Sequence, residues 1–234
     1  MQHAQGHPIE PSTIALQAQG VTLTGDLTVP AAPGAVIVFA HGSGSGRLSP
    51  RNRAVAQALV NDGFATLLFD LLTREEEIAE RYTRHLRFDI PLLSTRLVGA
   101  IEWVNRQDRF ATVPTGLFGA STGAAAALIA ATRVDVGAVV SRGGRPDLAG
   151  DALPRVRCPT LLIVGGADVE VIELNRRAMA KLAAPAALHI VPRAGHLFEE
   201  PGALHEVIDV ASEWFRRWLP TTRWREQHAA PWGH

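Results

Sequence analysis

The stretch GLFGASTGAAAALIAA, residues 116–131, decides the fold predicted for this chain. It begins as an apolar strand, is interrupted by Gly-Ala-Ser-Thr-Gly, and continues as an alanine-rich run that is typical of a helix. Side chains at a turn this tight would collide with the neighbouring strand and helix, so small residues are needed on either side of its tip. We therefore predict a sharp strand–turn–helix with Ser121 at the tip, between Gly119 and Gly123.

Such a turn holds the Ser121 hydroxyl above the sheet, at the N-terminus of the helix predicted over residues 122–131. A helix N-terminus offers unpaired N–H groups and a positive potential, which favour an oxyanion nearby. A glycine-rich turn that happens to contain serine has the same five-residue pattern. The strand before the turn and the helix after it favour a nucleophilic serine.

A serine hydroxyl is a poor nucleophile at neutral pH and needs a base, which a carboxylate orients. In this arrangement the acid and then the histidine should follow the serine, each after a later strand. Asp168 follows the apolar run LLIVGG, and His196 follows LHIV in a glycine-containing loop. The order Ser121, Asp168, His196 predicts a catalytic triad. Alternatively, Asp168 could cap the next helix and His196 could be an ordinary surface histidine.

The glycine-rich loop FAHGSGSG, residues 39–46, follows another predicted strand. It lies where the second donor of an oxyanion hole is expected, so we assign the two donors to the backbone amides of Ser43 and Thr122. A phosphate-binding loop is the competing interpretation, but neither GxxxxGK[ST] nor GxGxxG is present. His41 is predicted to be structural, because a base that precedes the serine would break the expected order.

The rest of the chain alternates between short apolar runs and amphipathic segments. The apolar runs are typical of strands covered on both faces and cover residues 34–42, 64–70, 136–141, 159–166 and, more weakly, 187–192. Apolar residues at helical spacing predict helices over 53–62, 90–104 with Asp89 as N-cap, 170–182 and 204–218. Period-two patterning over residues 14–30 predicts a hairpin. The fold class predicted is α/β, a doubly wound, mostly parallel sheet with an antiparallel N-terminal edge.

Length and charge narrow the classes of function. The 234 residues carry 23 basic and 23 acidic side chains, so no net field attracts nucleic acid or an anionic membrane. We find no signal peptide, no apolar run of membrane-spanning length, and a single cysteine, which together predict a cytoplasmic protein. We expect one domain over residues 1–234, with 1–12 and 221–234 as tails. The second tail carries two tryptophans and could join a homodimer.

Four motifs carry a resemblance to a known family: HGSGSG, GASTG, GGAD and AGHLFEEP. With them the chain resembles the α/β-hydrolase superfamily, and within it the dienelactone-hydrolase-like group, over about residues 20–219. The resemblance implies an α/β-hydrolase fold and hydrolysis of esters or lactones through an acyl-enzyme, without a cofactor. Dienelactone hydrolases carry a cysteine nucleophile, whereas this chain has Ser121. A serine carboxylesterase acting on a small-molecule ester is therefore predicted. The alternatives are a lactone hydrolase, a thioesterase, an amidase or a non-catalytic binder of small ligands.

No metal site is predicted, because the histidines are scattered and HExxH does not occur. Cys158 stands at the start of its strand, at the opposite end from Asp168, and is predicted to be a buried structural thiol. The segment between residues 141 and 159 is too short for a large cap. The charged segment 71–87 is predicted to be a solvated helix, with a partial lid as the alternative.

Arg142 follows a strand at the edge where the triad is expected, and ligands bind at that edge in open α/β sheets. Its guanidinium could hold an anionic group of a substrate. It could equally pair with a structural carboxylate such as Asp147. Arg47 and Arg51 raise the first possibility more weakly.

Overall fold

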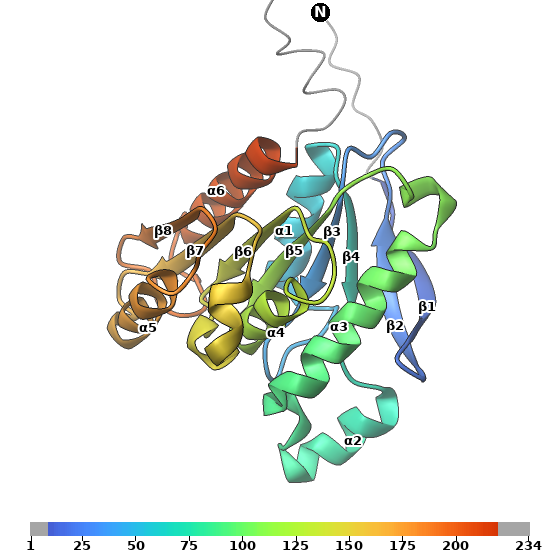
Figure 1. Cartoon of the computed structure of the whole chain (residues 1–234), viewed down its shortest axis with the longest axis horizontal. Coiled ribbons are helices and arrows are strands. Elements are labelled where there is room, and N and C mark those ends of the chain that lie inside the picture. Colours follow the sequence, from blue (N-terminus) through green and yellow to red (C-terminus); the bar gives the residue numbers. More distant parts are fainter. Residues whose placement is uncertain (1–8, 220–234) are drawn as a thin grey trace, which may run out of the picture.

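The computed structural model describes residues 9–219, which form one open sheet of eight strands with helices on both faces (Figure 1). The tail predicted over 221–234 and most of the tail predicted over 1–12 lie outside the described residues. The strands are β1 (Ser12–Ala18), β2 (Val21–Thr28), β3 (Val36–Ala40), β4 (Ala65–Phe69), β5 (Thr115–Ala120), β6 (Ala138–Arg142), β7 (Thr160–Gly165) and β8 (Ala186–Val191).

The strand order is β1-β2-β4-β3-β5-β6-β7-β8. The hairpin β1–β2 joins β4 in antiparallel pairing, and all the other pairs are parallel. The antiparallel N-terminal edge and the parallel remainder are confirmed. Because β3 to β8 run parallel, their carboxyl ends meet at one edge of the sheet.

Helices cover the two faces separately (Figure 1). The helices α1 (Pro50–Asn61) and α6 (Ala203–Trp218) pack on one face, and α3 (Ile90–Asn105), α4 (Thr122–Ala130) and α5 (Val169–Met179) cover the other. The remaining helical segments are α2 (Arg74–Thr83) and the 3₁₀ segments η1 (Leu86–Phe88), η2 (Asp108–Phe110) and η3 (Pro146–Arg155). Within residues 9–219, no helix combines the length and the apolar character that crossing a bilayer requires.

Each face of the sheet has its own apolar layer. Leu97, Ile101 and Leu117 lie in the layer under α3 and α4, and Phe118 and Phe215 lie in the layer under α6. Because β3 to β7 are buried on both sides, their sequences are continuously apolar. The edge strand β8 is only partly buried, which explains its weaker pattern.

Local capping sets the helix boundaries. The predicted N-cap of α3 is confirmed, since the Asp89 carboxylate accepts a hydrogen bond of 3.0 Å from the Leu92 amide. Helix α1 begins at Pro50, three residues earlier than predicted. Ser49 caps it and the fixed φ of Pro50 suits a first helical turn, so the helix begins there.

The charged segment predicted as a solvated helix contains α2, which projects beyond the carboxyl edge of the sheet (Figure 1). A buried carboxylate, Glu80, accepts hydrogen bonds from the backbone of His85 and Leu86 and from the side chains of Thr83 and Arg87. Burial alone would raise the pKa of Glu80, but these hydrogen bonds outweigh it and lower that pKa to about 2. Glu80 thus fixes the chain between α2 and α3. The segment between β6 and β7 holds only η3, so the prediction of no large cap is confirmed.

Candidate active site

Ser121 stands at the junction of β5 and α4 in a backbone conformation that side chains rarely adopt, with φ 51° and ψ −122°. Both flanking glycines are sterically required. A Cβ on Gly119 would lie 2.5 Å from the Cα of Ala124, and a Cβ on Gly123 would lie 2.1 Å from the carbonyl oxygen of Ala40. The strand–turn–helix is therefore built as the sequence predicted.

Asp168 and His196 follow β7 and β8 and meet at the same edge. Oδ2 of Asp168 lies 2.8 Å from Nδ1 of His196. Asp168 also occupies the N-cap position of α5, but its side chain makes no capping hydrogen bond. Of the two roles considered for Asp168, helix capping and contact with His196, its carboxylate therefore performs the second. That contact turns Nε2 of His196 into the nitrogen available for proton exchange.

Backbone contacts bring the serine turn next to the histidine loop. The Ser121 amide donates to the carbonyl of Arg142 at 3.2 Å, and a Cβ on Gly143 would lie 3.6 Å from Cε1 of His196. Among residues 9–219, no hydrogen bond links the Ser121 hydroxyl to the imidazole. Such contacts are often long without substrate and tighten when it binds.

The glycine-rich loop after β3 lies against the serine. A Cβ on Gly42 would come within 2.9 Å of the Cβ of Ser121. The Ser43 amide, one of the two predicted oxyanion donors, donates to Oγ1 of Thr122 at 3.0 Å. The Thr122 amide belongs to the first residue of α4, where no earlier turn of the helix supplies an acceptor. The sequence did not predict that the Thr122 hydroxyl is the partner of the Ser43 amide, because no local pattern relates two positions that are 79 residues apart.

His41 is buried, and both of its ring nitrogens are used by the backbone. Nδ1 lies 3.0 Å from the carbonyl oxygen of Gly42, and Nε2 accepts from the Leu71 amide at 3.0 Å. A nitrogen that accepts carries no proton, so Nδ1 holds the proton and the ring is neutral. Burial lowers the pKa of His41, more than its contact with Gly42 and the charge of Asp70 raise it. The histidine joins two loops, in agreement with its predicted structural role.

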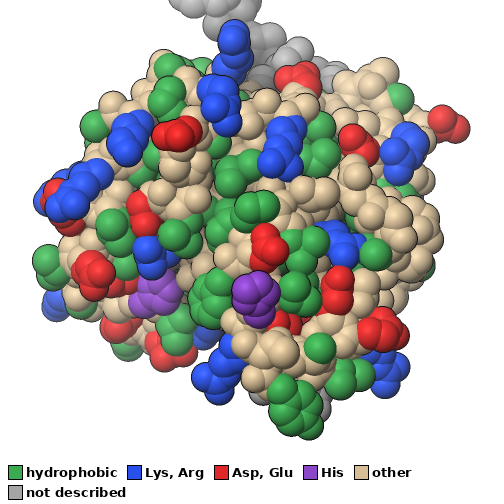
Figure 2. All heavy atoms as spheres, turned by 60° about the horizontal axis from the view of Figure 1, so that its bottom comes forward, with side chains coloured by type: hydrophobic (Ala, Val, Ile, Leu, Met, Phe, Trp, Pro, Cys, Tyr) green, Lys and Arg blue, Asp and Glu red, His purple; other side chains and the backbone are tan. Residues whose placement is uncertain are grey.

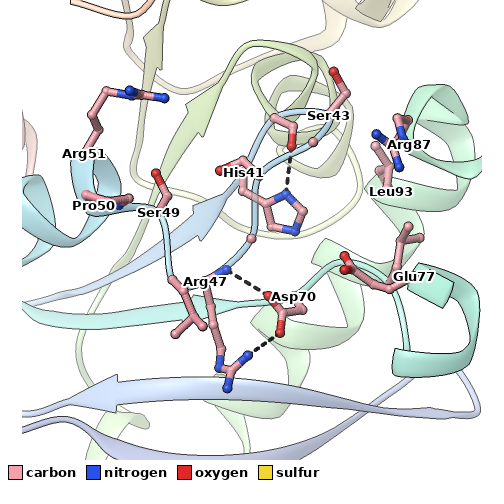
Figure 3. Close-up of a pocket in the computed structure, with 16 residues that line it drawn as sticks. His41, Ser43, Arg47, Ser49, Pro50, Arg51, Asp70, Glu77, Arg87 and Leu93 are labelled. Atoms are coloured by element: carbon pink, nitrogen blue, oxygen red, sulfur yellow. Dashed lines mark hydrogen bonds and ion pairs between the residues drawn. The ribbon is translucent and has the colours of Figure 1, made fainter. Parts of the chain in front are cut away.

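A pocket of about 600 Å³ opens beside this loop (Figure 3). Its walls come from the chain between β3 and α1, the residues after β4, α2 and the start of α3. Two of its arginines are already paired: Arg47 with Asp70 at 2.6 Å and Arg87 with Glu80 at 2.9 Å. Figure 2 turns the lower side of the Figure 1 view forward and shows basic, acidic and histidine side chains intermixed on it.

The guanidinium of Arg142 is buried, with 8% of the residue exposed, and it makes no ion pair with Asp147. Asp147 instead pairs with Arg145 at 2.8 Å, so the predicted alternative of an Arg142–Asp147 pair is wrong. Successive strand residues point to opposite faces, so Arg142 and Ser141 leave β6 on opposite sides. Arg142 extends toward α1, where its Nη2 lies 3.3 Å from Oδ1 of Asn52.

The one cysteine does not belong to this edge. Cys158 is buried and unpaired ahead of β7, and burial is the main cause that raises its pKa to about 11. A thiol protonated to that degree is not an activated nucleophile. Within the described part of the chain, no three His, Cys, Asp or Glu side chains are grouped so that they could hold a metal ion.

The chain is similar to known proteins both in sequence and in fold. A model of the dienelactone hydrolase family matches residues 23–228. A solved structure described as a dienelactone hydrolase from Anabaena variabilis is 53% identical in sequence, with a TM-score of 0.89 over 91% of this chain and 99% of that one. A serine hydrolase without a lid from Xanthomonas campestris shares the fold at 22% identity, with a TM-score of 0.74 over 92% and 98% of the two chains.

A relative in Mycobacterium tuberculosis (strain ATCC 25618 / H37Rv) is 55% identical over 210 residues, which are 89% of this chain and 46% of the relative. It bears the provisional name phosphoribosyl transferase. The chain thus spans about half the length of the curated relative that it matches.

Proposed function

Because the chain belongs to the dienelactone hydrolase family, we propose that it is a serine hydrolase that cleaves carboxylic esters through an acyl-enzyme on Ser121. One observation carries the proposal: the hydrogen bond of 2.8 Å between Asp168 and His196, formed beside a serine held at positive φ. This pairing orients a base where a nucleophile is presented.

In the proposed reaction, Nε2 of His196 takes the hydroxyl proton as Oγ of Ser121 attacks the ester carbonyl carbon. Asp168 accepts the Nδ1 proton of His196 in a hydrogen bond and stabilises the imidazolium. His196 then protonates the departing alcohol as the carbon–oxygen bond breaks. Water, deprotonated by His196, attacks the acyl-enzyme and releases the acid and Ser121.

The tetrahedral intermediate needs donors for its oxyanion. The Thr122 amide supplies one, at the start of α4. The Ser43 amide is the second donor that we propose, and it reaches the oxyanion when its hydrogen bond to the Thr122 hydroxyl gives way or is shared.

Serine, and not cysteine, is the nucleophile in this proposal. Cys158 precedes β7, whereas Asp168 follows its end. At about 3.3 Å per residue, the strand separates the two ends by roughly 20 Å. The chemistry therefore fits a serine carboxylesterase better than an enzyme specialised for dienelactone.

The name phosphoribosyl transferase belongs to a relative about twice as long as the matched region. We propose that the matched half of that relative is a hydrolase module like this chain. A transferase activity would then reside in its other half.

The experiment that tests the proposal compares the protein with its Ser121→Ala variant on p-nitrophenyl butyrate. We expect kcat to fall on the order of 10⁴-fold or more, because the nucleophile is lost. A fluorophosphonate probe should label the unaltered protein at Ser121 and leave the variant unlabelled. Near-normal turnover by Ser121→Ala would rule the mechanism out. A folded protein that neither turns over esters nor takes the label would point to a non-catalytic binder.

A further inference from the structure

A buried positive charge beside the serine turn has no negative partner among the residues that the structure describes. Arg142 is 8% exposed, and its one hydrogen bond is the contact of 3.3 Å with the amide oxygen of Asn52. Its Nε and Nη1 are buried without a partner. No carboxylate within residues 9–219 forms an ion pair with it. Buried charges are normally paired, and the described residues supply no counter-ion to this guanidinium.

A second arginine increases the positive charge there. Burial and then the charge of Arg51 lower the pKa of Arg142 to about 10, which still leaves it protonated at neutral pH. Nε of Arg51 is also buried without a partner. The opposite end of this guanidinium, Nη1, forms an ion pair of 3.0 Å with the carboxylate of Glu199, whose side chain is 67% exposed, so water screens that pair more than it screens the buried Arg142. The charges of Arg51 and Arg142 repel each other, and an anion between them would relieve that repulsion.

The start of α1 adds to the same positive region. Arg51 and Asn52 lie in the first turn of this twelve-residue helix, at the positive end of its dipole, where the Asn52 amide donates to Oγ of the N-cap Ser49 at 3.4 Å. A helix start attracts anions only weakly, and here the buried Arg142 reaches into it through its contact with Asn52. The cationic side chain and the helix start therefore converge on one position.

That position adjoins the catalytic edge. Arg142 pairs with Ala120 across the β5–β6 ladder, and its carbonyl accepts from the Ser121 amide. Neighbouring strands lie about 5 Å apart, so the Arg142 side chain leaves the backbone directly beside the serine turn. Its guanidinium lies 5.9 Å from the ring of Phe198, in the loop that carries His196. Arg51 and Ser43 both line the pocket shown in Figure 3.

We propose that Arg142 and Arg51 form a subsite for an anionic oxygen group, a carboxylate or a phosphate, carried by the ester that Ser121 attacks. The subsite deepens the proposed function, on which it rests, by making anionic esters the preferred substrate class. The other two arginines of the pocket, Arg47 and Arg87, are already neutralised by Asp70 and Glu80. Nε and Nη1 of Arg142, the two nitrogens without a partner, lie on different sides of the guanidinium, and each could donate one charge-assisted hydrogen bond to such an anion.

The first test compares two esters of equal chain length, p-nitrophenyl hydrogen glutarate and p-nitrophenyl pentanoate. We expect the protein to favour the anionic ester by about tenfold or more in kcat/KM, the range of a charge-assisted hydrogen bond. Arg142→Met should abolish that preference. Arg145→Met is the matched control, since Arg145 is already paired with Asp147, and it should keep the ratio. Equal kcat/KM for both esters in the unaltered protein would overturn the subsite.

A second test needs no turnover. Calorimetry with the Ser121→Ala variant should detect binding of glutarate or of inorganic phosphate, and loss of that binding when Arg142→Met is added. Binding of only one of the two anions identifies the group, and binding of neither overturns the subsite. If Arg142→Met fails to fold, Arg51→Met replaces it, because the Arg51 side chain is 31% exposed. Anion binding without turnover of either ester would contradict the hydrolase and leave the subsite standing.

Discussion

Two histidines follow parallel strands at the same edge of the sheet, His41 after β3 and His196 after β8, and their surroundings differ in every respect. His41 is buried, and backbone groups occupy both of its nitrogens. His196 has a side chain that is 40% exposed, and one nitrogen is held by the Asp168 carboxylate. Position at the catalytic edge therefore does not make a base.

The difference lies in which nitrogen is available. A general base must accept a proton from a substrate or nucleophile, so one nitrogen must be unbonded and reachable. A neighbouring carboxylate must also favour the charged ring. Asp168 holds Nδ1 of His196, and Nε2 has no hydrogen-bond partner among the described residues. Both nitrogens of His41 are bonded to the backbone, and burial lowers its pKa although the charge of Asp70 acts in the opposite direction. The comparison predicts separable effects, catalytic for one histidine and structural for the other.

The largest effect is expected from His196→Gln. This change removes the proposed base and should lower kcat on p-nitrophenyl butyrate by about 10⁴-fold. Because the side chain is partly exposed, the free energy of unfolding should change little, within about 0.5 kcal/mol. Ester turnover and urea denaturation of the same preparation measure both. Retained turnover would remove His196 from the mechanism.

The reverse result is expected from His41→Phe. The change strands the buried Leu71 amide and the Gly42 carbonyl, and each unsatisfied group costs about 1–3 kcal/mol. The midpoint of urea denaturation should therefore fall clearly. Turnover per folded molecule should fall far less than in His196→Gln. If His41→Phe instead abolished turnover in a stable protein, the two assignments would be reversed.

The pH dependence of stability should carry a smaller effect of the same histidine. Since burial lowers the pKa of His41, the unfolded chain binds a proton below about pH 6.5 that the folded chain does not. Stability contributed by the neutral ring is thus complete above that pH and is lost as the pH falls toward the lowered pKa. The loss reaches at most about 1.4 kcal/mol per pH unit. Urea midpoints measured from pH 8 to pH 5 should decline less steeply in His41→Phe. Parallel declines in the two proteins would contradict this account.

The smallest effect is expected from a third histidine, His189 on β8. Its Nε2 lies 2.7 Å from a carboxylate oxygen of Glu206 in α6. Like His196 it contacts a carboxylate and is partly exposed, but it lies within the strand and not in the loop after it. Exposed pairs of this kind contribute about 0–1 kcal/mol. His189→Gln should leave kcat unchanged and shift the unfolding free energy by less than that. A large loss of kcat would contradict the view that a histidine must lie at the carboxyl edge of the sheet to take part in catalysis.

Much of the fold could be predicted because it depends on local patterns. The apolar runs located the buried strands, and Gly119 and Gly123 located the turn at Ser121, since no larger residue fits there. The chain order of Asp168 and His196 predicted that they meet. Alternation along a strand could also have shown that Arg142 and Ser141 point to opposite faces, but it does not name the partner found there.

The remaining features depend on contacts between distant segments. The hydrogen bond from Ser43 to Thr122 and the contact of Arg142 with Asn52 join positions that no periodicity relates. The role of Glu80 depends on how the chain turns back after α2. The capping box of Thr73 and Glu76 that begins α2 was visible as a T-x-x-E sequence and could have placed that boundary.

The left-handed backbone of Ser121 separates what the reaction requires from what folding would select. A φ of 51° with a ψ of −122° suits glycine, whereas serine is strained there, at a typical penalty of about 1–3 kcal/mol. A Ser121→Gly protein should therefore be inert yet harder to denature than its parent. Under the proposed ester cleavage, a lineage released from that activity would be expected to drift toward glycine at this position, because folding alone does not favour serine there.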